Sequence, residues 1–481
     1  MDERTQLLSE SSSQTLLSET TTLQSTKFSY LHESLSLIAA TAPISLSFAM
    51  QNIVQACSIM IAGKLGTFEL GLASYGYMFA TCTGSMVAIG GSTALDTLCG
   101  QSFDPETPTK NSQILGVYLR RGILVLSLLS VVVIAPIWWF SEHLFVALGQ
   151  DEEFARATGR FLNIMIPGGL LQVISECMKK FLQVQRHSNA VGWITTTTSV
   201  IGVLANALLV PASLGLWGAP VACVVYNFSN VSVLTVYVWS HPSLTPNLGS
   251  ITGETFKDLM PFSILAVTGI LTVATEWWSF EILAMMAAAF DEPSIGAQSV
   301  SLATSLCPHP ADRSLTIQPQ ILMTSDLIFT TISLGLGVQL ATESPPSLAA
   351  TTQGTQNSPM ASKNIYGYLF SSNKEIVALT AQVLPLMAGF QVLDLANGGA
   401  GDVLRGAGKN HISGMCNFVA YYGVGLTSAW FLGFRLEMGL VGLWGGIIMG
   451  SFVLLGLQVG FVGRIDWEKE GRRIVERCGD I

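Results

Sequence analysis

The sequence predicts an all-α, polytopic membrane protein, and its composition and hydropathy support that prediction. Of the 481 residues, 49% are hydrophobic and only 11% are charged, and the mean hydropathy is +0.50. Soluble globular domains usually carry about 25% charged residues. Apolar stretches of roughly 20 residues, the length that crosses a bilayer as a helix, recur along almost the whole chain.

Eleven of these stretches are expected to be membrane-spanning helices. They divide into an N-terminal helix bundle, residues 35–240, and a C-terminal helix bundle, residues 257–465. In chain order the expected spans are Leu35–Ala62, Glu69–Gly91, Ile114–Phe140, Phe161–Cys177, Val191–Pro211, Gly215–Trp239, Leu259–Phe290, Ile321–Val338, Ile376–Asn397, Ile412–Phe434 and Gly439–Val462.

The two ends of the chain are expected to be cytoplasmic tails. Residues 1–34 are rich in Ser, Thr and Leu and poor in aromatic residues, which is typical of a disordered segment. The run from Glu3 to Leu8 also matches an acidic dileucine sorting pattern, which favours a vacuolar over a plasma membrane. Residues 466–481 form the second tail.

The distribution of Lys and Arg orients the expected spans, because cytoplasmic loops carry an excess of these residues. If the N-terminus is cytoplasmic, the early basic loops are cytoplasmic as well. With eleven spans, however, the basic residues near the C-terminus would lie on the opposite side of the membrane. Hydropathy and charge therefore disagree unless a span is missing between Val338 and Ile376. The basic residues that we assign to loops or tails are Lys110, Arg120, Arg121, Lys179, Lys180, Arg186, Lys257, Arg405, Lys409, Arg464, Arg472 and Arg473.

Two polar blocks interrupt the C-terminal half. Residues 339–361 are rich in Pro, Ser and Thr and cannot cross lipid as a helix, since Pro and unsatisfied backbone groups are costly there. Residues 301–320 are similarly polar, and their removal would join Val300 to Ile321 in one apolar segment. We hypothesise that both blocks are splicing or gene-model artefacts.

A weak internal repeat suggests two related bundles, an arrangement common in transporters. Leu216-Trp217-Gly218 matches Leu443-Trp444-Gly445, and Leu170-Leu171-Gln172-Val173 parallels Gly389-Phe390-Gln391-Val392. A basic loop follows Val173 in the first half and Val392 in the second half.

The candidate functional segment is Glu276-Trp277-Trp278-Ser279-Phe280-Glu281, within an apolar stretch. A charged side chain at mid-bilayer costs at least ~2.5–3.5 kcal/mol and is tolerated mainly where it faces a bundle interior or a water-filled cavity. Five residues separate the two acids by about 140° around a helix, so they should not share one face. The alternative is that both acids reach toward the headgroups and that the tryptophans are interface anchors.

These residue types fit cation exchange. Burial penalises the charged form of a carboxyl group, so a buried acid can bind a proton on one side and release it on the other. A cationic substrate favours the ionised form and competes with the proton. Trp277, Trp278 and Phe280 offer ring faces for cation–π contacts, worth ~0.5–2 kcal/mol each.

The chain resembles the eukaryotic branch of the multidrug and toxic compound extrusion (MATE) family. The resemblance rests on four motifs in order, which together span residues 30–465. They are Gly63-Lys64-Leu65-Gly66 with Glu69-Leu70, Ala94-Leu95-Asp96-Thr97-Leu98-Cys99-Gly100-Gln101-Ser102-Phe103, the Glu276–Glu281 segment, and Val403-Leu404-Arg405-Gly406-Ala407-Gly408.

The resemblance implies two six-helix lobes around a central cavity, nominally twelve helices, and export of organic cations in exchange for protons or sodium ions. It implies that Glu276 and Glu281 are the acids of the seventh helix and that Asp394 is an acid of the tenth. Asp326 lies near an acidic position of the eighth helix. Asp394 could instead cap a helix break at the small-residue run that begins at Asn397.

Other assignments follow from the same reading. We expect Asp96 and Gln101 to fix a loop at a helix–loop junction, and Leu404-Arg405-Gly406 to be structural. The expected partners are small organic cations and the lipid bilayer, with no nucleic acid, no metal, no cofactor beyond the coupling ion, and a monomeric state. The alternatives are a lipid flippase of related fold, which would need a cavity rich in Lys and Arg, a membrane-embedded enzyme, for which no catalytic constellation is found, and a non-functional product of a defective gene model.

Overall fold

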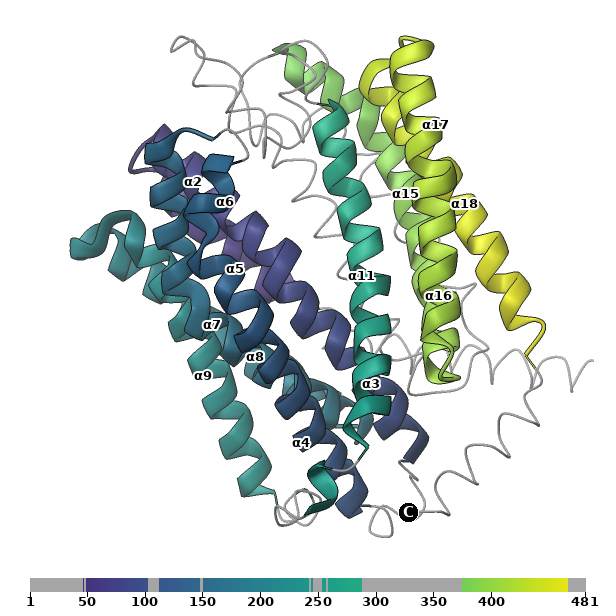
Figure 1. Cartoon of the computed structure of the whole chain (residues 1–481). Coiled ribbons are helices and arrows are strands. Elements are labelled where there is room, and N and C mark those ends of the chain that lie inside the picture. Colours follow the sequence, from purple (N-terminus) through teal and green to yellow (C-terminus); the bar gives the residue numbers. More distant parts are fainter. Residues whose placement is uncertain are drawn as a thin grey trace, which may run out of the picture.

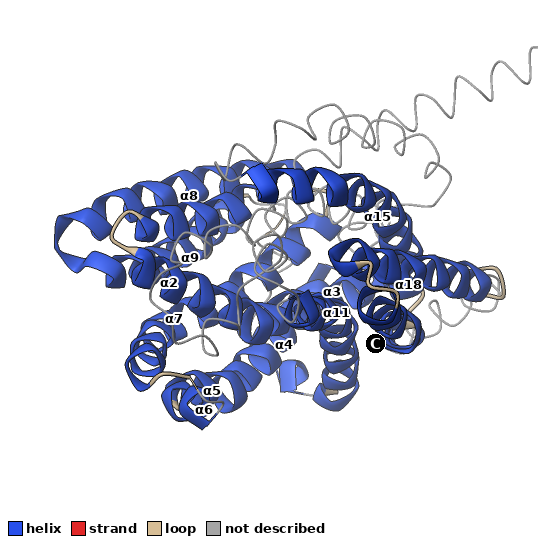
Figure 2. Ribbon diagram, turned by 90° about the horizontal axis from the view of Figure 1, so that it is seen from above, coloured by secondary structure: helices blue, strands red, loops and turns tan. Residues whose placement is uncertain are grey.

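The computed structural model describes residues 46, 49–102, 112–147, 150–241, 244, 253–256, 258–287 and 374–465. Six of the expected features lie outside these residues: both tails, the Ile321–Val338 span, Asp326, and the polar blocks 301–320 and 339–361. Within the described part the chain is helical and contains no strand (Figure 2). Seven of its helical segments are long and apolar enough to cross a membrane.

The N-terminal half forms one bundle of long helices (Figure 1). A helix over residues 49–63 comes first, and several later helices continue directly into π-helical turns. The elements are α2 (Thr67–Ala80), η1 (Thr81–Ser85), α3 (Met86–Ser102), α4 (Ser112–Leu129), η2 (Ser130–Ile134), α5 (Ala135–Trp139), α6 (Ser141–Ala147), α7 (Glu152–Val184), α8 (Ser188–Leu209), η3 (Val210–Leu214), η4 (Gly215–Trp217) and α9 (Gly218–Ser240).

The C-terminal half forms a second group of helices beside the first (Figure 1). Its elements are η5 (Gly253–Phe256), α11 (Leu259–Ala287), α15 (Lys374–Gly406), α16 (Asn410–Asn417), η9 (Phe418–Gly425), α17 (Leu426–Trp430), η10 (Phe431–Arg435) and α18 (Gly439–Val462). The segment from α16 to η10 replaces a regular helix with alternating α and π turns.

Three helices are longer than hydropathy predicts. The second expected span continues through η1 and α3 to Ser102, and the fourth extends in both directions to become α7. Asp151 starts α7, because its carboxylate accepts hydrogen bonds from two backbone N–H groups in the first turn. The expected span Ile376–Asn397 is part of α15, which runs unbroken to Gly406.

The longer α7 corrects the assignment of two lysines. Lys179 and Lys180 were expected in a basic loop, but both lie inside α7 and are 4% and 6% exposed. Each forms a buried ion pair, Lys179 with Glu176 and Lys180 with Asp96. Because their charges are compensated inside the bundle, these lysines carry no topological information.

The described helices resolve the disagreement between hydropathy and charge. Figure 1 shows the end of α11 and the start of α15 at the same end of the molecule. At the other end, the Thr97 hydroxyl of α3 donates a hydrogen bond to the Arg405 carbonyl at 2.9 Å. Arg405 and Lys409 therefore lie at the end where α3 finishes and α4 begins, as the charge rule requires.

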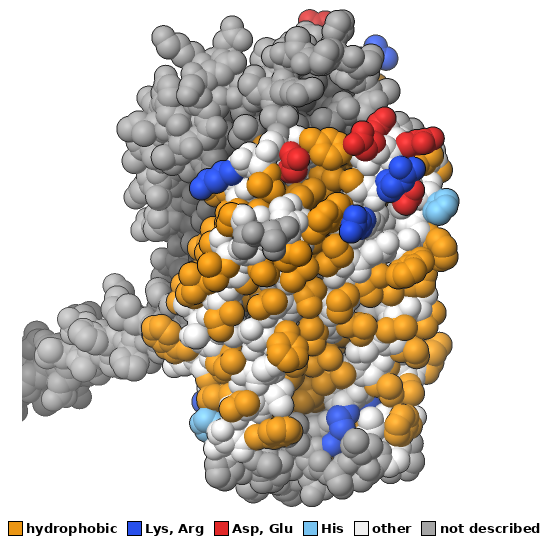
Figure 3. Space-filling view, turned by 90° about the vertical axis from the view of Figure 1, so that its left-hand side faces the viewer, with side chains coloured by type: hydrophobic (Ala, Val, Ile, Leu, Met, Phe, Trp, Pro, Cys, Tyr) orange, Lys and Arg blue, Asp and Glu red, His pale blue; other side chains and the backbone are white. Residues whose placement is uncertain are grey.

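The side surface of the N-terminal bundle suits a bilayer. Figure 3 shows hydrophobic side chains over most of this face and charged side chains near its two edges. Large apolar side chains of α8 and α9 are exposed, among them Trp193, Leu208, Phe228 and Trp239. Lipid contact explains this exposure, because the hydrocarbon interior leaves apolar side chains no reason to be buried in protein.

The backbone shows the internal repeat, but it aligns the two halves three residues away from the alignment that the sequence suggested. Gly215 and Gly439 both have positive φ, 54° and 57°, and each is preceded by a π-helical turn. Three residues later, Gly218 and Gly442 both touch backbone, since an added Cβ would lie 2.7 Å from Leu209 C and from Leu432 C respectively. Leu216 therefore corresponds to Leu440 and not to Leu443.

Candidate functional site

The two acids of α11 face different neighbours. The carboxyl group of Glu276 meets that of Asp394 on α15 in hydrogen-bonding contact. Glu281 points toward the N-terminal bundle, where the Cys82 thiol of η1 donates to its Oε1 at 3.7 Å. Both glutamates are half-buried. The structure thus brings Glu276 and Asp394 together and sets Glu281 apart, as the 140° separation predicts.

Trp278 links the two bundles. Its indole N–H donates to the Cys82 carbonyl at 3.2 Å, and its side chain is 46% exposed. A π-helical turn such as η1 departs from the regular backbone ladder, so a carbonyl there is available to an outside donor. Trp277 is half-buried on the same helix. The indole contact occurs well inside α11 and not at its end, which does not suit a headgroup anchor.

Asp394 lies in the interior of an unbroken helix. Its side chain is 7% exposed, and α15 continues for three more turns beyond it. The small residues after Asn397 therefore produce no helix break for Asp394 to cap. The Asn397 amide instead donates to the Ser451 carbonyl of α18 at 3.3 Å.

Gln101 lies at the expected helix–loop junction, as the penultimate residue of α3, but Asp96 lies inside the helix. Asp96 is 9% exposed, and its Oδ2 lies 2.7 Å from Lys180 Nζ. A buried carboxylate requires such a partner, because an unpaired charge in the interior is strongly unfavourable. Asp96 thus joins α3 to α7. Gln101 faces the turn after α15, since an added Cβ on Gly408 would lie 3.4 Å from its Nε2.

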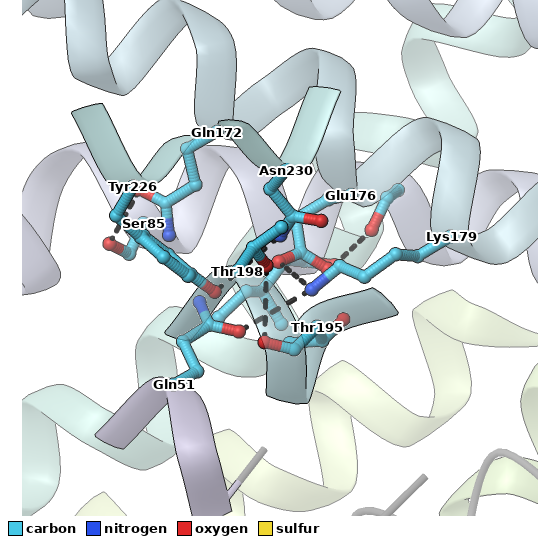
Figure 4. Close-up of polar contacts among 11 residues, drawn as sticks. Gln51, Ser85, Gln172, Glu176, Lys179, Thr195, Thr198, Tyr226 and Asn230 are labelled. Carbon is cyan, nitrogen blue, oxygen red and sulfur yellow. Dashed lines mark hydrogen bonds and ion pairs between the residues drawn. The ribbon is translucent and has the colours of Figure 1, made fainter. Parts of the chain in front are cut away.

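A buried polar cluster occupies the interior of the N-terminal bundle (Figure 4). Lys179 Nζ donates to Glu176 Oε1 at 2.6 Å and to Gln51 Oε1 at 3.4 Å. On the neighbouring helices, Thr195 and Asn230 each have a buried oxygen without a hydrogen-bond partner. Sequence reasoning missed this cluster, although the spacing Glu176-x-x-Lys179 in an apolar stretch places both side chains on one helix face.

The described part of the chain contains no group of three or more His, Cys, Asp or Glu side chains that could hold a metal ion.

Comparisons with known proteins agree with this arrangement. Residues 43–208 match the MatE family model. The chain is 31% identical over 448 residues to Protein DETOXIFICATION 16 of Arabidopsis thaliana, covering 91% of this chain and 89% of that protein. It is 28% identical to Multidrug and toxin extrusion protein 2 of Mus musculus, with 93% and 77% covered.

Solved structures show the same fold. The crystal structure of the eukaryotic MATE transporter AtDTX14 superposes with a TM-score of 0.78 at 26% identity and covers 93% of this chain and 98% of that one. A Vibrio cholerae MATE transporter, at 12% identity and a TM-score of 0.73, shares the fold, with 91% and 98% covered. From its sequence, its helices and these relatives, the chain belongs to the eukaryotic branch of the multidrug and toxic compound extrusion family of membrane transporters.

Proposed function

We propose that this transporter is a secondary antiporter that exports organic cations in exchange for protons. The observation that carries the proposal is the contact between the carboxyl groups of Glu276 and Asp394, well inside α11 and α15. Two carboxyl groups in contact resist ionising together, because their negative charges repel each other and burial penalises the charged form of both. The pair therefore holds a proton, or a substrate cation in its place.

The competition between these two occupants is the basis of exchange. A proton neutralises the pair from one side of the membrane, and an organic cation requires the ionised pair. Binding of either excludes the other, so the carrier moves them in opposite directions. Trp277 and Trp278, close by on α11, supply aromatic faces that suit a flat cation.

Uptake into proteoliposomes tests the proposal. The purified chain would be reconstituted, a pH gradient imposed, and accumulation of ethidium followed by fluorescence. We expect Glu276→Gln and Asp394→Asn each to reduce the initial rate at least tenfold. Glu142→Gln is the matched control, because Glu142 is a half-exposed glutamate on α6 whose carboxylate forms an ion pair with Arg156. Unchanged uptake by Glu276→Gln would show that the assigned role of Glu276 is wrong.

The same vesicles separate the alternatives. A sodium gradient without a pH gradient drives uptake only if sodium is the coupling ion. Movement of a fluorescent phospholipid without ethidium transport would support a flippase, although the acidic and aromatic surroundings of Glu276 argue against a phosphate ligand. A folded wild-type chain that transports neither probe would identify it as a non-functional product.

We also propose a vacuolar location, on the basis of the acidic dileucine pattern from Glu3 to Leu8. A fluorescent fusion should label the vacuolar membrane of a plant or yeast cell. Replacement of Leu7 and Leu8 by Ala should move the fusion to the plasma membrane. A fusion that labels the plasma membrane before substitution would contradict this assignment.

A further inference from the structure

Arg405 lies where the two bundles meet. It occupies the last turn of α15 and forms an ion pair with Asp402 of the same helix. Its backbone carbonyl accepts the hydrogen bond from Thr97 on α3 of the other bundle. Its guanidinium group interacts electrostatically with Asp96 of the N-terminal bundle and with Glu276 of α11.

The charges around Arg405 form a chain across the seam between the bundles. In order, Lys180 pairs with Asp96, Asp96 interacts with Arg405, Arg405 interacts with Glu276, and Glu276 meets Asp394. With Asp402 included, two cationic and four carboxylate side chains share the region. When all are ionised the region keeps an excess of negative charge, and each proton or singly charged cation that the Glu276–Asp394 pair takes up reduces that excess.

Arginine suits a bridging role better than a simple counter-ion role. Its planar guanidinium group presents five N–H donors in a fixed fork and stays charged in any protein environment. Asp402 alone can use only part of that fork. The side chain of Arg405 is 20% exposed and that of Asp402 is 8% exposed, so this ion pair lies largely inside the protein.

Resting on the proposed function, we propose that Arg405 is a positioning residue that ties the bundles together while Glu276 is ionised and releases them when Glu276 is neutralised. An ionised Glu276 on α11 and an ionised Asp96 on α3 both attract the guanidinium electrostatically. A proton or an organic cation at Glu276 removes one of these two attractions. The empty carrier is thereby kept from rearranging, and the loaded carrier is free to do so, which makes transport an obligatory exchange.

The ratio of ethidium exchange to ethidium release tests this role of Arg405. Proteoliposomes loaded with radiolabelled ethidium at pH 8 on both sides would be diluted into buffer with or without unlabelled external ethidium. Wild type should exchange labelled for unlabelled ethidium at least tenfold faster than it releases ethidium into empty buffer, because its empty carrier cannot return. In Arg405→Gln we expect release to approach exchange, with a ratio below about three (a factor of 10 corresponds to about 1.4 kcal/mol in an equilibrium or barrier).

A purely structural role for Arg405 would lower both fluxes together and leave their ratio unchanged. Arg435→Gln is the matched control, since Arg435 lies at the end of η10 and packs on Trp430 away from the seam. It should keep the wild-type ratio. Asp402→Asn, which removes only the partner on the same helix, should also keep it.

A second variant protects the test against misfolding of Arg405→Gln. The double substitution Asp96→Asn with Lys180→Met removes the other end of the bridge without changing net charge, and it should lower the ratio in the same way. Wild-type ratios in both Arg405→Gln and the double variant would overturn the proposal. Absence of any ethidium flux in wild type would instead refute the proposed function, so the two failures are distinguishable.

Discussion

Gln172 of α7 and Asp394 of α15 stand at equivalent positions in the two bundles. Both helices end in the same turn, in which Arg186 and Gly408 have positive φ of 64° and 72° and each donates its N–H to the carbonyl three residues before it. Gln172 precedes Arg186 by as many residues as Asp394 precedes Gly408. Gln172 accepts a hydrogen bond from Ser85 at 3.2 Å, whereas Asp394 meets Glu276. An amide in one bundle thus replaces an acid in the other.

The buried pair of Lys179 and Glu176 should be critical for stability. Removal of one partner leaves an uncompensated charge, which typically costs about 3–5 kcal/mol. We expect Lys179→Met and Glu176→Gln each to lower the thermal unfolding midpoint in detergent by several degrees, and the double variant to recover most of the loss. A double variant that loses the sum of the two single effects would contradict a direct pairing.

Glycine is required where α3 and α11 cross. An added Cβ on Gly90 would lie 2.7 Å from Ile270 Cα, and one on Gly269 would lie 2.4 Å from the Gly90 carbonyl oxygen. Because backbone atoms cannot move aside as a side chain can, Gly90→Ala should destabilise the protein by about 1–3 kcal/mol. Thermal unfolding in detergent measures this, with Gly71→Ala on α2 as the control.

That control has no atom within 4 Å of the added Cβ. Alanine at an unobstructed helical position is expected to be neutral or stabilising by up to about 1 kcal/mol. Equal effects of the two substitutions would show that the contact between the helices is not tight.

Trp278 should contribute to cation binding through its ring. We expect Trp278→Ala to weaken ethidium binding by about 3- to 30-fold, in line with a cation–π contact of ~0.5–2 kcal/mol. Trp278→Phe, which keeps a smaller aromatic face and loses the indole N–H, should bind within a factor of three of wild type. Fluorescence titration measures both. The control is Trp193→Ala on the outer face of α8, where the side chain is 69% exposed.

The stability of the α7–α8 turn should depend on pH. Burial lowers the pKa of His187 below its ordinary value, and the neighbouring His241 lowers it further. The unfolded chain, with a histidine pKa of about 6.5, then binds the proton more readily than the folded chain. The stabilising contribution is therefore complete above that value and is lost as the pH falls through the folded pKa.

Thermal unfolding at pH 8 and pH 5.5 measures this contribution. The midpoint of wild type should decrease more between these two values than that of His187→Gln, in which the hydrogen bond to the Tyr237 hydroxyl is also altered. His143→Gln, which removes an exposed histidine of α6, should behave as wild type. A wild-type midpoint that rises on acidification relative to His187→Gln would contradict the sign of the shift.

The helices could be predicted from the sequence because a bilayer permits few other structures. Apolar stretches such as Gly439–Val462 became helices with the expected bounds, since every backbone group in lipid must be bonded within its segment. The sequence also singled out Glu276 as a candidate, because an acid between Ile and Leu residues is tolerated mainly where it has a protein or water partner.

Hydropathy predicted the wrong helix end where a charged side chain pairs with a residue far away in the sequence. The fourth span was expected to end at Cys177, just before Lys179 and Lys180, because isolated lysines do not enter lipid. The partner of Lys180 is Asp96 on another helix, and no local pattern reveals that pairing. The repeat was misaligned for a related reason. Trp217 and Trp444 are conspicuous in the sequence, but the glycines at close backbone contacts fix the true register.

The bare crossing of α3 and α11 has a mechanical consequence. Helices that interlock through side chains resist sliding, since each knob must leave its hole before the next can enter. At Gly90 and Gly269 the two backbones touch, with the Thr93 hydroxyl group beside them. Because large side chains do not interlock at this point, we expect α3 and α11 to turn against each other here with less resistance than at an interlocked crossing.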